Sequence, residues 1–114
     1  LAGDSKAEAE RNFMPRAKWR LARDRGQFIS MQTPEEVLAE GFSESDEMRI
    51  QAMLRDGFVG EGAEVAQRIK ALGAELGVQE IAIVTWAHEE SIRQRSYELL
   101  AHHLGVSEAQ GVAA

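Results

Sequence analysis

The stretch from Phe58 to Leu100 constrains the fold of this chain more than any other part of the sequence. It predicts a strand at Phe58–Gly60, an amphipathic helix, a second strand at Glu80–Trp86 and a last helix. The second run is apolar or β-branched almost throughout, which is typical of a parallel strand covered on both faces. Two β-α units cannot form such a sheet, because a parallel sheet needs more strands than these. The sequence therefore predicts the end of a larger α/β fold.

The first 57 residues are predicted to be a helical segment. Three places are typical of helix N-caps, namely Asp4 or Ser5, then Thr33, then Ser43, each followed by acidic residues in the first turn. A kink or break is expected just before Pro15, because proline removes a backbone donor and clashes with the preceding turn. We expect a single partial domain in which residues 58–106 form the last two β-α units and residues 107–114 form a flexible tail.

Length and composition exclude several classes of protein. A chain of 114 residues holds one domain at most, and a first residue Leu1 in place of Met indicates a processed product or a fragment. The absence of cysteine excludes disulfides, thiol catalysis and thiolate metal sites. No run approaches the roughly 18 apolar residues of a membrane span, and the start lacks a signal peptide. We therefore expect a cytoplasmic protein that does not associate with membranes.

The net charge of −6 is unevenly distributed. Residues 1–30 carry seven Lys or Arg against four acids, whereas residues 31–61 carry two against eight. This acidic balance argues against nucleic-acid binding, which needs concentrated positive charge. The basic first segment, interleaved with Phe13 and Trp19, favours an amphipathic helix with its aromatic residues inward and its cations toward water. An ion-pair surface facing the acidic middle segment is the other interpretation.

The order and spacing of the second half resemble a known family. The matching segments are Phe58-Val59-Gly60, the helix from Glu64 to Gly77, Glu80 to Thr85, His88, and Arg95-Ser96-Tyr97-Glu98-Leu99-Leu100-Ala101. Together they resemble the carboxyl-terminal end of the luciferase-like flavin-dependent monooxygenases, a family of (β/α)8 TIM barrels. The first half is compatible more loosely, as the helix after the sixth barrel strand and a variable segment before the seventh. One departure is Glu61-Gly62, where the family usually has Thr-Pro.

The resemblance implies a fold and an activity. The fold is α/β, the carboxyl-terminal part of a TIM barrel, predominantly helical with two short parallel strands. The parent protein is expected to be an oxidoreductase that uses reduced FMN and dioxygen on a small organic substrate, and to form a homo-oligomer. Whether the cofactor is FMN or a deazaflavin stays open. The family's flavin-phosphate contacts fall outside this chain, so the chain alone is expected to be inactive.

Candidate site residues lie where barrel enzymes place them, at the carboxyl ends of strands and in the loops that follow. These are Glu61 after the first predicted strand and Trp86 and His88 after the second. Trp86 either walls a flavin or substrate pocket or packs against the last helix. His88 either donates a hydrogen bond to a ligand or lies on the surface at a helix start. We expect no metal site, since the adjacent pair His102-His103 diverges by about 100° on a helix.

Three functions follow from these observations. The first is part of a flavin-dependent monooxygenase, as the resemblance implies. The second is a non-enzymatic, self-associating structural module, because two β-α units alone expose apolar strand faces and open edges. The third, a small nucleic-acid-binding protein, depends only on the basic first segment.

Overall fold

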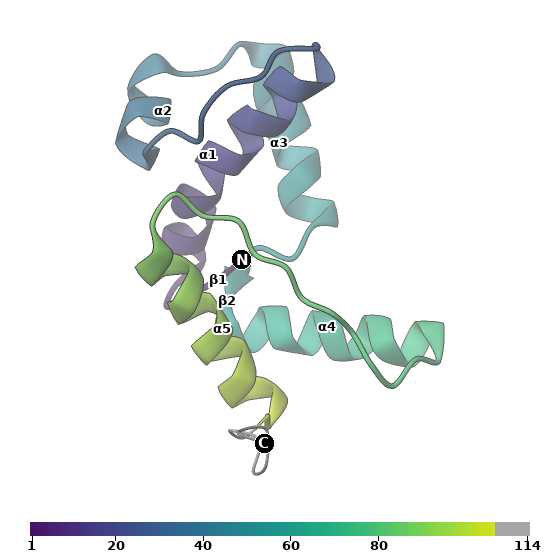
Figure 1. Ribbon diagram of the computed structural model, residues 1–114. Helices are drawn as coiled ribbons and strands as arrows, with labels where there is room; N and C mark the ends of the chain where they lie inside the picture. Colours follow the sequence, from purple (N-terminus) through teal and green to yellow (C-terminus); the bar gives the residue numbers. More distant parts are fainter. Residues whose placement is uncertain (107–114) are drawn as a thin grey trace.

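The computed structural model describes residues 1–106, which form two short strands and five helices (Figure 1). The elements in chain order are β1 (Ala2–Gly3), α1 (Lys6–Asp24), α2 (Pro34–Glu40), α3 (Glu44–Asp56), β2 (Gly60–Glu61), α4 (Gly62–Leu76) and α5 (Glu90–Leu104). A mostly helical chain with two short parallel strands is therefore confirmed. The predicted flexible tail lies outside the described residues.

The two strands pair in parallel, each with a helix directly after it. Ala2 lies opposite Gly60 and Gly3 opposite Glu61, so the first and the middle parts of the chain meet at this pair. The strand predicted at Phe58–Gly60 overlaps β2 (Gly60–Glu61) only at Gly60, since the observed strand begins two residues later. The second strand is β1, a pair of residues within the segment that the sequence predicted to be helical.

Residues 80–86, predicted as a buried strand, form no regular secondary structure, and this prediction was wrong. The backbone amides of residues 79–84 make no hydrogen bond within the described part of the chain. The side chains of Val84 and Trp86 are 73% and 55% exposed. A strand exists only as part of a hydrogen-bonded ladder, and β1 and β2 pair only with each other here. The β-propensity of the segment is therefore not sufficient to form a strand.

The strand pair separates two apolar clusters. One lies between α1 and α3, and its buried members are Ala9, Phe13, Ala17, Leu21, Ile50 and Val59. The other lies between α4 and α5, and its buried members are Ala2, Val65, Ala66, Ile69 and Leu100. Phe58 packs on the second cluster while its neighbour Val59 belongs to the first, because successive side chains of an extended segment point to opposite faces. The short strands thus hold the two halves together.

Local signals place the helix starts as predicted. The hydroxyl oxygens of Ser5, Thr33 and Ser43 each accept a hydrogen bond from the backbone amide three residues later, at 3.1 to 3.2 Å. The expected break near Pro15 is absent, since α1 continues through this residue. The proline ring is among the most completely buried side chains, and this packing offsets the lost backbone hydrogen bond.

Three consecutive residues of the last helix, Arg95-Ser96-Tyr97, form hydrogen bonds to β1, to the residue after it and to the segment before α5. The hydroxyl oxygen of Ser96 accepts a hydrogen bond from the backbone amide of Ala2 at 2.9 Å, and both groups are buried. Arg95 donates to the carboxylate of Asp4 at 2.8 Å. The Tyr97 hydroxyl accepts from the backbone amide of Thr85 at 3.1 Å. The residues that carry the family resemblance therefore make structural contacts.

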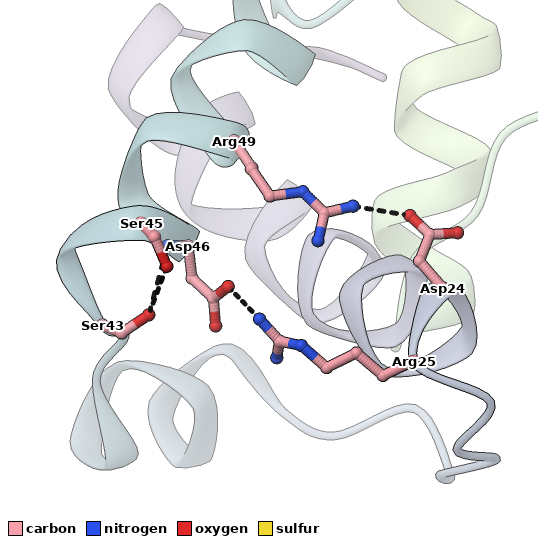
Figure 2. Close-up of polar contacts among 6 residues, drawn as sticks. All are labelled: Asp24, Arg25, Ser43, Ser45, Asp46 and Arg49. Carbon is pink, nitrogen blue, oxygen red and sulfur yellow. Dashed lines mark hydrogen bonds and ion pairs between the residues drawn. The ribbon is translucent and has the colours of Figure 1, made fainter.

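The basic helix and the acidic middle segment form ion pairs with each other. Arg11 meets Glu35 on α2 with 2.6 Å between nitrogen and oxygen, and Lys18 meets Glu40 on the same helix. Figure 2 shows the corresponding contact with α3, where Arg25 binds the carboxylate of Asp46. Cations of α1 thus meet acids of residues 31–61, as the ion-pair interpretation of the charge pattern requires.

The Asp46 carboxylate has an unusual environment for a charged group. Its residue is only 8% exposed, and the hydrogen bond and the charge of Arg25 hold the pKa of Asp46 below its ordinary 3.8. A second pair, Arg49 with Asp24 at 2.8 Å, lies beside it and again joins α3 to α1 (Figure 2). Two ion pairs therefore hold the amino-terminal end of α3 against the carboxyl-terminal end of α1.

The lowered pKa of Asp46 predicts a pH-dependent contribution to stability. Because the pKa is lower in the folded state, the ion pair stabilises the protein above the unfolded-state pKa of about 3.9 and loses its contribution as pH falls through the folded-state value. We expect Asp46→Asn to lower the urea midpoint at pH 7. At pH 3 the difference from the unsubstituted chain should be smaller.

The matched control is Asp56→Asn, because the Asp56 side chain is 76% exposed and its nearest cation is 3.7 Å away. It should shift the midpoint little at either pH. A difference between Asp46→Asn and the unsubstituted chain that is the same at both pH values would contradict the assignment.

Candidate functional site

The three predicted site residues lie in different surroundings. His88 lines a cavity of about 270 Å³, and neither Glu61 nor Trp86 is among its lining residues. Trp86 lies against α1, where its ring meets the guanidinium group of Arg16. Glu61 is exposed at the end of β2. The structure therefore does not bring the three side chains into one pocket.

Trp86 packs against α1 and completes a stack in which cations and aromatic rings alternate. The other members of the stack lie on α1. The guanidinium carbon of Arg16 lies 4.7 Å from the ring centroid of Trp86 and 4.6 Å from that of Trp19. Arg23 covers the Trp19 ring at 5.5 Å. Partial burial lowers the pKa of Arg16, and the charges of Arg20 and Arg23 add to the effect. The spacing of these residues along α1 was visible in the sequence, but the pairing of Arg16 with Trp86 was not.

The stack attaches the segment before α5 to α1. Thr85 is 6% exposed, and its backbone amide donates a hydrogen bond to the Tyr97 hydroxyl. The ring of the next residue, Trp86, packs against the guanidinium group of Arg16. Trp86 is still 55% exposed, so it is neither a core residue nor enclosed by a pocket. Its ring is therefore available as one open face for a flat or apolar partner.

His88 lies at a cavity bounded by α1, the start of α2 and the start of α5. The lining residues are Glu8, Arg11, Asn12, Pro34, Glu35, Ala87, His88, Glu89 and Ile92. Arg11 is already bound to Glu35, and this hydrogen bond lowers the pKa of the Glu35 carboxyl. The cavity thus presents one exposed imidazole among several carboxylates.

These surroundings do not fit FMN. A flavin phosphate needs cations or free backbone amides, and the cavity offers three carboxylates against one arginine that is already paired. Its volume of about 270 Å³ also lies below the usual 300 to 1,000 Å³ of cofactor pockets. The described residues also contain no group of three or more His, Cys, Asp or Glu that holds a metal ion.

Glu61 lies at the start of α4. It occupies the cap position of that helix, although its side chain makes no capping hydrogen bond. A Cβ atom on the next residue, Gly62, would lie 3.1 Å from the Cβ of Leu99 and 3.2 Å from the ring of His103. The glycine therefore permits close approach of α5 to the start of α4, which accounts for Glu61-Gly62 at this position.

Comparisons with known proteins support the fold alone. No protein-family model matches the sequence, and no curated protein matches it. The crystal structure of apo-MsnO8 matches with a TM-score of 0.75 at 19% sequence identity. The match covers 95% of this chain and 33% of that one, so this chain spans about a third of the length of MsnO8. The chain thus has the fold of part of a TIM barrel. Among residues 1–106, no helix has the length and apolar character to cross a bilayer.

The stack at Arg16 predicts a measurable contribution to stability. Arg16→Met keeps an unbranched side chain of similar length but removes the charge from two aromatic faces, each contact contributing about 0.5–1 kcal/mol. We expect a loss of about 1 kcal/mol in urea unfolding and greater quenching of tryptophan fluorescence by acrylamide. The matched control is Arg20→Met, because Arg20 contacts no aromatic ring in the described residues. Equal effects of the two substitutions would show that the stack contributes nothing.

Proposed function

We propose that this chain is the closing part of a flavin-dependent, luciferase-like monooxygenase. The observation that carries the proposal is the structural match to MsnO8, which is consistent with the resemblance seen in the sequence. The segments from Phe58 to Ala101 resemble the end of that family in order and spacing. The match to MsnO8, a luciferase-like monooxygenase, covers 95% of this chain and 33% of that one.

In this proposal the chain contributes scaffold to the parent enzyme. The flavin supplies the redox chemistry that oxidises a small organic substrate with dioxygen. The cavity at His88 does not fit the cofactor, so the flavin is held by the part of the barrel that lies outside these 114 residues. Among the candidate residues of this chain, Trp86 is the best suited to line the substrate pocket, because its ring is exposed.

A second function is favoured by one specific observation. Residues 79–84 combine unpaired backbone amides with exposed apolar side chains, among them Ile81 and Val84. Such a segment associates readily with another strand. Self-association of the isolated chain, with no catalytic role, is therefore the alternative, and the parent enzyme is also expected to form a homo-oligomer.

The test compares the 114-residue chain with the full-length protein encoded by its reading frame (the product of the reading frame). We expect the short chain to leave FMN fluorescence unchanged up to about 100 µM, a weak-binding limit. The product of the reading frame should bind reduced FMN and consume dioxygen. Tight FMN binding by the short chain alone would show that the cofactor site is misplaced. A reading frame that encodes no further β-α units would contradict the barrel proposal.

Sedimentation velocity of the 114-residue chain separates the two candidates. The self-associating module predicts a concentration-dependent oligomer and no flavin binding by the product of the reading frame. A stable monomer with a cooperative melt counts against that module.

A further inference from the structure

A large apolar groove lies away from the three predicted site residues. It has a volume of about 760 Å³ and is bounded by α1, α2 and α3, which gather at one end of the molecule (Figure 1). Its apolar lining comes from Met14, Leu38, Phe42, Met48 and Ile50. Leu38 is 51% exposed and Met48 is 70% exposed. Apolar side chains of this size are thus left open to solvent around a concave surface.

The groove follows one face of α3 for almost the whole helix. The α3 residues that line its rim are Glu44, Glu47, Met48, Gln51 and Arg55. Their spacing of three or four residues puts them on one side of a helix. From Glu44 to Arg55 the helix rises about 16 Å, which equals about three turns of a second helix laid beside it. The α3 residues that line the groove therefore extend far enough to contact about three turns of a helix.

Charge at the two ends of the groove is opposite in sign. Glu44 and Glu47 lie at the amino-terminal end of α3 and form no ion pair with any residue between 1 and 106. Arg55 lies at the other end, where its nearest carboxylate is the exposed Asp56 at 3.7 Å. A bound helix with cations at its carboxyl end and acids at its amino end complements both. These are also the charges that the dipole of such a helix favours.

Among residues 1–106, no helix of a second copy has an exposed apolar stripe that would fit. Outside the groove, Leu76 is the one large hydrophobic residue that is exposed on a helix of the described part. A single exposed residue does not make the apolar stripe that a groove of three turns requires. The partner is therefore a different segment.

We propose that this groove binds an amphipathic helix of a partner protein, antiparallel to α3. The partner helix presents apolar residues at i, i+3 or i+4 and i+7 to Leu38 and Met48, with lysine or arginine near its carboxyl end over Glu44 and Glu47. The proposal does not depend on the flavin-dependent function. Methionine suits such a surface, because its flexible thioether adapts to different apolar partners.

The test is a binding titration of the full 114-residue chain by fluorescence anisotropy. The probe is a labelled helix-forming peptide of about 15 residues with a leucine stripe, glutamate in its first turn and lysine in its last. We expect Leu38→Ser and Met48→Ser each to weaken binding by about tenfold, the effect of losing about 1.4 kcal/mol of apolar contact. Both side chains are exposed, so the thermal melt should be unchanged, and circular dichroism checks this.

Matched controls separate the groove from nonspecific adhesion. Phe28→Ser removes an apolar side chain that is 88% exposed outside the groove, and it should not change binding. Replacing both Glu44 and Glu47 with glutamine should weaken binding at low salt and have little effect at high salt. A peptide with its two charged ends exchanged should bind more weakly. Equal binding by both peptides, or groove variants that bind like the unsubstituted chain, would overturn the proposal.

Discussion

One buried hydrogen bond joins β1 to the last helix, and the strand pair and one apolar cluster meet at the same residue, Ala2. The backbone amide of Ala2 donates to the Ser96 hydroxyl, across 94 positions of sequence. Ala2 is at the same time the partner of Gly60 in the strand pair and a member of the apolar cluster between α4 and α5. Removing the acceptor leaves a buried amide without a partner, which costs about 1–3 kcal/mol. This contact therefore connects the strand pair to the last helix and to the apolar cluster between α4 and α5.

The local part of this architecture was predictable and the nonlocal part was not. Caps such as Ser43 act on amides three residues away, so the sequence contains both partners of each interaction. A strand needs a neighbour, and neither the irregular backbone of residues 80–86 nor the two-residue strand at Ala2 leaves a signal in local composition. The same reason explains the positions of Trp86 and His88. Their neighbours, Arg16 and Glu8 on α1, come from the other end of the sequence.

Most cations on α1 and at its end contact other groups of the described chain. Cations on α1 are largely used in ion pairs with α2 and α3 or in the stack with Trp19 and Trp86. Few are left free to hold an anionic cofactor, and the cavity at His88 is rich in carboxylates. In a larger barrel these contacts would fix the helix layer around strands supplied by the remaining two thirds of the fold, while the open face of residues 79–84 would meet those strands.

Hydrogen exchange on Ser96→Ala shows directly whether the bond between Ser96 and Ala2 joins the strand pair to α5. In the unsubstituted chain the amides of Ala2 and Gly60 should exchange slowly, and those of residues 79–84 rapidly. In the variant, protection should fall at Ala2, at Gly60 and along α5, with little change within α3. Ser91→Ala, an exposed position on the same helix, serves as the control. Protection of Ala2 and α5 that is unchanged in Ser96→Ala would contradict the account.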